Sequence, residues 1–113
     1  MISDVHEYRD LPLDWDTFGG VPATCQATRF AVELLESLQA EPTIPSPLVR
    51  PISGGVFLKW DFGDFSVYFE VESDRVVCVV SGQEWLRMGY EDESFDVSKA
   101  RDAVRRTSEA RKP

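Results

Sequence analysis

The sequence predicts an α+β domain in which a helix, a three- to four-stranded antiparallel meander and a C-terminal helix follow one another. Three observations predict this order. Apolar residues recur with a helical period over roughly residues 24–40, and they alternate with polar residues from Val56 to Val80. A second, narrower helical stripe begins near Asp96 or Ser98. At 113 residues the chain fits a single domain, 1–113.

The first helix is predicted by an apolar face with amphipathic spacing. Thr24 is an acceptable N-cap, and Pro22 suits a position in the first turn. Four prolines between residues 42 and 51 then favour an extended crossing over a helix. The first 20 residues show no clear period, so we expect an ordered arm that ends in a turn at Gly19-Gly20. The apolar helix face consists of Ala27, Phe30, Ala31, Leu34, Leu35 and Leu38.

The strands are predicted by strict alternation around a turn at Gly63-Asp64. Closing the hairpin there pairs Trp60 with Val67 and places every large apolar partner on one face, a match that a slip of one residue would destroy. Ser73-Asp74 is expected to form the next turn, and 82–95 holds a possible fourth strand and a loop. The expected core face comprises Val56, Leu58, Trp60, Phe62, Phe65, Val67, Phe69, Val71, Val76, Cys78 and Val80.

The opposite face of the predicted sheet is less polar than a solvated face. Two rows cross it in this register, Phe57–Glu70–Val77 and Lys59–Tyr68–Val79. Either the C-terminal helix covers them with Val97, Ala100 and Val104, or they are exposed. Exposed aromatic and apolar side chains of this kind favour a binding surface. The expected partner-binding residues are therefore Phe57, Tyr68, Glu70, Glu72, Val77 and Val79.

The charge of the chain is unevenly distributed. Its formal charge is −8, but residues 1–98 carry −12 and residues 99–113 carry +4. This balance argues against direct binding to nucleic acid or to an anionic membrane. We interpret the basic segment as a solvated helix end. The alternatives are that it docks on the acidic body of the protein or on an acidic partner. No apolar run is long enough for a membrane span and the start lacks a signal peptide, so we expect a cytoplasmic protein.

Most catalytic and metal-binding motifs are missing from the sequence. Its single histidine, His6, lies near the N-terminus, and its two cysteines are 53 positions apart, which favours separate thiols over a disulfide. The Asp14-x-Asp16-x-x-Gly19 spacing fails as a calcium loop, because Phe18 and Cys25 stand where oxygen ligands are needed. We expect this segment to form a turn with Trp15 as an anchor. No catalytic residue, cofactor or metal ligand is predicted.

A longer pattern covers residues 11–75. It runs from Asp14-Trp15-Asp16 through Gly19-Gly20 and an amphipathic helix to Gly54-Gly55-Val56-x-Leu58-x-Trp60. In these motifs the chain resembles a group of small bacterial proteins of unknown function. The resemblance implies a prokaryotic, intracellular protein and carries over no catalytic residue.

Together these features favour a small acidic protein-binding module without catalytic activity, such as an antitoxin, an immunity-type inhibitor or an adaptor. Its partner would be a protein or a second copy of the chain. Two alternatives remain open. The acidic body, including Glu91-Asp92-Glu93 and Asp96, would suit a DNA mimic that inhibits a nucleic-acid-binding protein. Glu70 and Glu72 share a strand face and would suit a small enzyme with an unrecognised carboxylate site.

Overall fold

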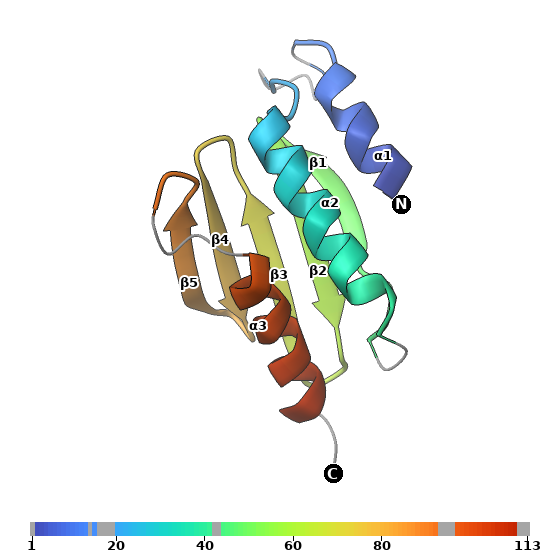
Figure 1. Ribbon diagram of the computed structural model, residues 1–113, viewed down its shortest axis with the longest axis vertical. Helices are drawn as coiled ribbons and strands as arrows, with labels where there is room; N and C mark the ends of the chain where they lie inside the picture. The colour runs from blue at the N-terminus through green and yellow to red at the C-terminus, as the bar shows by residue number, and fades with distance from the viewer. Residues whose placement is uncertain (1, 14, 16–19, 42–43, 93–96, 111–113) are drawn as a thin grey trace.

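In the part of the chain that the structure describes, five strands form one antiparallel sheet, and their order in the sheet is their order in the chain. The computed structural model describes residues 2–13, 15, 20–41, 44–92 and 97–110 (Figure 1). The predicted meander is therefore present, with five strands rather than three or four. The strands are β1 (Leu48–Ile52), β2 (Gly55–Asp61), β3 (Ser66–Val71), β4 (Arg75–Val80) and β5 (Gln83–Gly89).

Within the described ranges, three α-helices accompany the sheet: α1 (Ile2–Glu7), α2 (Cys25–Gln39) and α3 (Val97–Ala110). The predicted N-cap of α2 is confirmed, because the Thr24 side chain accepts a hydrogen bond from the Ala27 backbone N–H at 3.2 Å. The helix α3 begins between the two starts expected from the sequence. Both α2 and α3 bury one apolar face, as their residue spacing requires.

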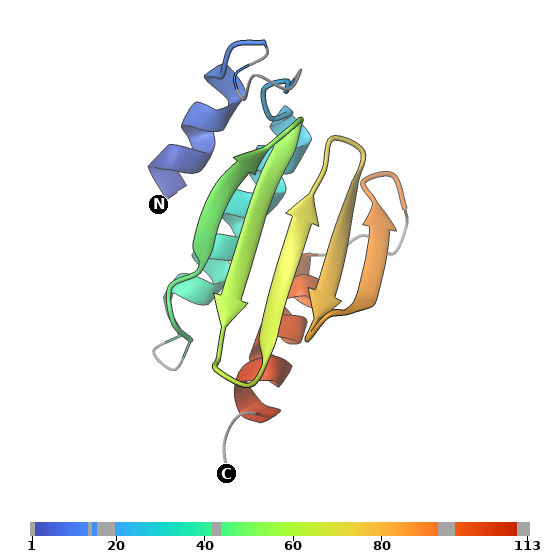
Figure 2. The same ribbon diagram turned by 180° about the vertical axis from the view of Figure 1, so that it is seen from behind.

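All three helices lie on the same side of the sheet (Figures 1 and 2). The helix α2 packs on β2 and β3, α3 packs on β3 and β4, and the two helices contact each other. The core forms between these layers, where Trp60 meets Phe69 edge to face with ring centroids 5.9 Å apart. The predicted contact of the α2 apolar face with the Leu58 and Trp60 side of the sheet is confirmed.

The predicted hairpin register is confirmed. Trp60 pairs with Val67 and Leu58 with Phe69, and the Phe62 N–H donates to the Phe65 carbonyl at 2.8 Å. Gly63 occupies the turn with φ +91°, a conformation that favours glycine. The turn at 73–74 is also confirmed by the pairing of β3 with β4. Phe65 alone departs clearly from the expected core face, because it lies at the hairpin end and is exposed.

Two elements differ from the sequence expectation. The strand β1 lies within the proline-rich crossing, and its Pro51 pairs with Val56. Proline is tolerated there because β1 is an edge strand, where one backbone N–H need not join the ladder. The N-terminal arm is largely helical, since α1 is followed by a 3-10 turn at Tyr8–Asp10. A helix of six residues is too short to show an amphipathic period, although Val5 is fully buried. The expected Asp16–Gly19 turn lies outside the described residues.

A glycine turn between β1 and β2 holds the segment that leads into α2. The Gly54 N–H donates to the Val21 carbonyl at 3.0 Å, and the Gly54 carbonyl accepts from the Thr24 N–H at 3.2 Å. Gly54 adopts φ +78°, which orients both groups toward this segment. The Trp15 indole N–H also donates to the Val21 carbonyl, at 2.9 Å. Trp15 therefore anchors the arm through Val21.

Candidate functional site

The side of the sheet opposite the helices is the candidate site. Figure 2 looks onto this side, and in the described part of the chain no helix crosses it. The two rows expected from the sequence are present: Phe57 pairs with Glu70 and Glu70 with Val77, while Lys59 pairs with Tyr68 and Tyr68 with Val79. The alternative in which the C-terminal helix covers these rows is wrong. Its apolar stripe, which includes Ala100 and Val104, is buried on the core side instead.

An aromatic pair lies across the two central rows of this uncovered face. The Phe57 and Tyr68 rings lie with their centroids 5.4 Å apart and their planes at 36°. Both side chains are half-buried, as are Glu70 and Glu72. Such cross-strand aromatic pairs stabilise a sheet and also supply rigid contact area at interfaces.

The two valines expected at this site are less accessible than the aromatic pair. Val77 exposes 6 % and Val79 exposes 9 % of its surface, so neighbouring side chains already shield both. In the β4–β5 register these neighbours include Arg87, opposite Val77, and Glu84, opposite Val79. The structure therefore brings all six predicted residues to one face, but it presents Phe57 and Tyr68 more openly than the valines.

The basic and acidic residues on the uncovered face balance each other in number. Residues opposite each other in an antiparallel pair point to the same side, so the pairing assigns the charged residues to this face. Two ion pairs neutralise half of them: Glu72 with Arg75 and Glu84 with Arg87, each at 2.6 Å. A nearly neutral face on a chain of charge −8 leaves the excess of acid on other surfaces. The face carries Arg50, Lys59, Arg75 and Arg87 against Asp61, Glu70, Glu72 and Glu84.

Both edges of the sheet are poor templates for another strand. Pro51 removes a donor from β1, and β5 carries a bulge where Val79 pairs with Glu84 but Cys78 pairs with Leu86. Proline and bulges at edges disfavour strand addition. The face, rather than either edge, is thus the open surface of the sheet.

Among the described residues, no group of His, Cys, Asp and Glu side chains is arranged to hold a metal ion. Both described cysteines are free, and they differ in environment. Cys25 is exposed at the start of α2, whereas burial on the core side raises the pKa of Cys78 to about 12 and keeps that thiol protonated near neutral pH.

The basic C-terminal helix is partly engaged within the molecule. Arg105 forms an ion pair with Glu41, just beyond the end of α2. The favoured interpretation of this segment was a solvated helix end, and this contact supports the alternative of docking on the acidic body at one position, Arg105. Of the acidic cluster at 91–96, the structure describes Glu91 and Asp92, both exposed, and the Asp92 carboxylate accepts from the Gly89 N–H at 2.8 Å. Glu93 and Asp96 lie outside the described residues.

A second surface was not expected from the sequence. Trp85 and Phe65 are exposed beside α3, and Arg106 borders the same hollow. In the sequence, only the unusual density of large apolar residues between Gly82 and Tyr90 indicates this second surface. The bulge that places Trp85 there has no recognisable sequence pattern.

No family model, no curated protein and no solved structure matches the chain. None of the helices that the structure describes has the length and apolar character to cross a membrane.

Proposed function

We propose that this protein is a small, non-catalytic protein-binding module of the bacterial cytoplasm, an antitoxin or immunity-type inhibitor or an adaptor. Its contact surface is the uncovered face of the sheet. One observation carries the proposal: the described helices all pack on one side, while the other side presents the Phe57–Tyr68 pair. Aromatic side chains of this kind are enriched at protein interfaces.

The charge pattern of the face favours a protein over a nucleic acid as the partner. A nucleic-acid backbone is uniformly negative and selects basic surfaces. A mimic of that backbone would need rows of carboxylates, whereas Glu70 stands here among Arg50, Lys59 and Arg87. Mixed charges around an apolar centre suit the polar rim of a protein interface.

The size of the face limits the area that a partner can bury on it. Five strands of about six residues span roughly 20 Å by 20 Å, or about 400 Å². A standard interface buries about 800 Å² on each partner. A partner confined to this face would therefore bind weakly, and a stable complex would also use the rim, where Leu48 is exposed at the β1 edge.

A double substitution tests the proposal. Phe57→Thr with Tyr68→Thr removes both rings but keeps residues that favour strands. We expect this variant to lose capture of the partner from a lysate of its own bacterium, measured by quantitative mass spectrometry on the tagged protein. Because both side chains are only half-buried, the free energy of unfolding should fall by no more than about 2 kcal/mol and the variant should stay folded.

A matched control removes two exposed apolar side chains from the segment that leads into α2, away from the uncovered face. Leu13→Thr with Val21→Thr should leave that capture unchanged. If the first variant still captures the partner, or if it unfolds, the uncovered face is not the contact surface.

A further inference from the structure

A hollow of about 270 Å³ lies between α3 and the sheet, on the side opposite the proposed protein-binding face. The hollow is lined from the sheet side by Phe65, Val80 and Trp85 of β5. It is lined from α3 by Ala103 and Arg106. Phe65 exposes 38 % and Trp85 46 % of its surface. The fold thus holds two large aromatic side chains open to solvent at one place.

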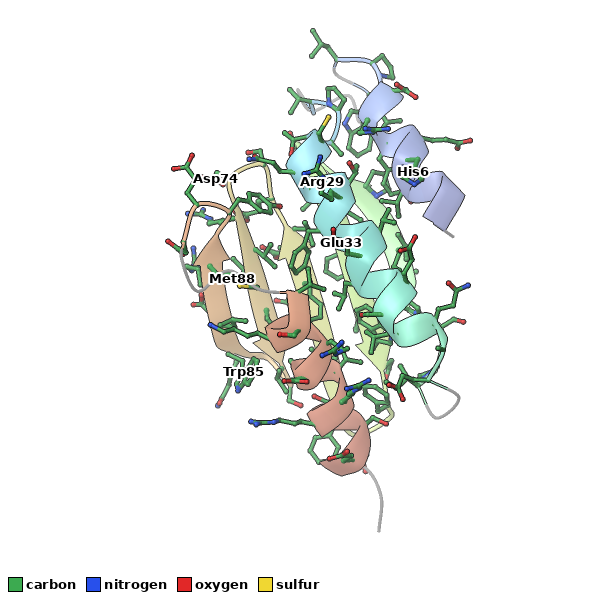
Figure 3. All side chains as sticks on the ribbon, in the orientation of Figure 1. His6, Arg29, Glu33, Asp74, Trp85 and Met88 are labelled. Atoms are coloured by element: carbon green, nitrogen blue, oxygen red, sulfur yellow. The ribbon has the colours of Figure 1, made fainter. Side chains whose placement is uncertain are left out.

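The β5 bulge places Trp85 at this hollow. Cys78 pairs with Leu86 and Val79 pairs with Glu84, so Trp85 is the extra residue of the strand. Bulges re-aim side chains that regular alternation would place elsewhere. Here Trp85 lies near the beginning of β5 and beside α3, whereas Met88 lies farther along the strand (Figure 3). Tryptophan and arginine are, with tyrosine, the residues most enriched at binding hot spots.

Arg106 gives the hollow a single unneutralised charge. Within the part of the chain that the structure describes, Arg106 forms no ion pair, whereas its neighbour Arg105 pairs with Glu41. Among the residues that the structure describes, no carboxylate lines the hollow. The complementary ligand is therefore an apolar group with a carboxylate next to it, because a guanidinium binds carboxylates by charge-assisted hydrogen bonds.

The size of the hollow limits that ligand to a single residue. Sites for drug-sized molecules occupy about 300–1,000 Å³, so this hollow suits one bulky side chain. In an extended peptide, successive side chains point to opposite sides, and an acidic neighbour would face away from Arg106. A C-terminal residue instead carries its carboxylate on the same Cα as its side chain.

We propose that this hollow binds the apolar C-terminal residue of another protein chain. Its side chain lies between Phe65 and Trp85, and its free carboxylate contacts Arg106. Capture of a terminal carboxylate is a recurring mode of peptide recognition. This site lies on the helix side and is independent of the uncovered sheet face.

The matched probes are N-acetyl-L-leucine and N-acetyl-L-leucinamide, which share a side chain but differ in the carboxylate. Their binding is followed at pH 7 by the NMR signal of the Trp85 indole N–H. The Trp85→Phe variant identifies this signal, because the signal is missing from its spectrum. We expect the acid to bind about tenfold more tightly than the amide. Arg106→Gln should abolish this difference, and Arg29→Gln, an exposed arginine of α2 outside the hollow, should preserve it.

Three results would overturn the assignment. If neither probe shifts the NMR signal of the Trp85 indole N–H, the hollow does not bind an apolar residue. If acid and amide bind equally, or if Arg106→Gln keeps their difference, Arg106 does not recognise a carboxylate. All three substituted residues are exposed, so unchanged melting temperatures will show that the variants are folded.

Discussion

Replacing Trp60 with alanine is expected to lower the free energy of unfolding by about 3–5 kcal/mol. Trp60 exposes only 1 % of its surface and packs edge to face on Phe69. Its removal leaves a cavity beneath α2, where Leu35 and Leu38 border a hollow next to the ring. The loss approaches the whole stability of many small domains. Urea denaturation followed by circular dichroism measures it.

Trp85→Ala is the matched control, because it makes the same chemical change at a side chain that exposes 46 % of its surface. We expect it to lower the free energy of unfolding by no more than about 1 kcal/mol. Equal losses in the two variants would show that Trp60 does not lie in the core. The paired register that places Trp60 opposite Val67 would then be wrong.

Gly55→Ala is expected to destabilise the protein by about 3 kcal/mol or more, although it adds only a methyl group. A Cβ at Gly55 would lie 1.8 Å from the Val71 carbonyl oxygen, and the other nearest atoms also belong to the backbone. A backbone cannot rotate away as a flexible side chain can. The substitution must therefore push β2 and β3 apart at the start of their pairing.

Gly89→Ala provides the comparison at another glycine in a strand. The nearest atoms to its added Cβ lie at 3.6 Å, an ordinary contact distance, and its φ is not in the left-handed region. We expect a change of no more than about 1 kcal/mol in the same urea experiment. A Gly55→Ala variant as stable as Gly89→Ala would contradict the close approach of the two strands.

The register of β2, β3 and β4 could be predicted from the sequence because alternation leaves one pairing that keeps all large apolar residues together. The strand β1 could not, since its five residues include Pro51 and show no alternation. Its position depends on the edge of the sheet, which accepts a proline that an interior strand would reject. The burial of Val5 in a six-residue helix likewise follows from tertiary packing rather than from a local pattern.

The residues of the candidate site could be predicted from the sequence, but their exposure to solvent could not. Alternation alone places Phe57 and Tyr68 on the side away from Trp60. Whether that side is covered depends on α3, and a narrow stripe around Ala100 and Val104 fits either side of a sheet. Contact with α2 and the ion pair between Arg105 and Glu41 hold α3 on the core side. Such contacts between distant segments have no signature in the sequence.

Site-specific photocrosslinking in living cells tests the proposed contact surface most directly. A benzophenone amino acid replaces Tyr68 on the uncovered face or, in the control, Glu33, which projects from α2 on the helix side (Figure 3). We predict that position 68 yields a discrete adduct with a second polypeptide chain, identified by mass spectrometry, and that position 33 yields none. An adduct at position 33 alone, the same adduct at both positions, or no adduct at position 68 would contradict a protein partner on the uncovered face.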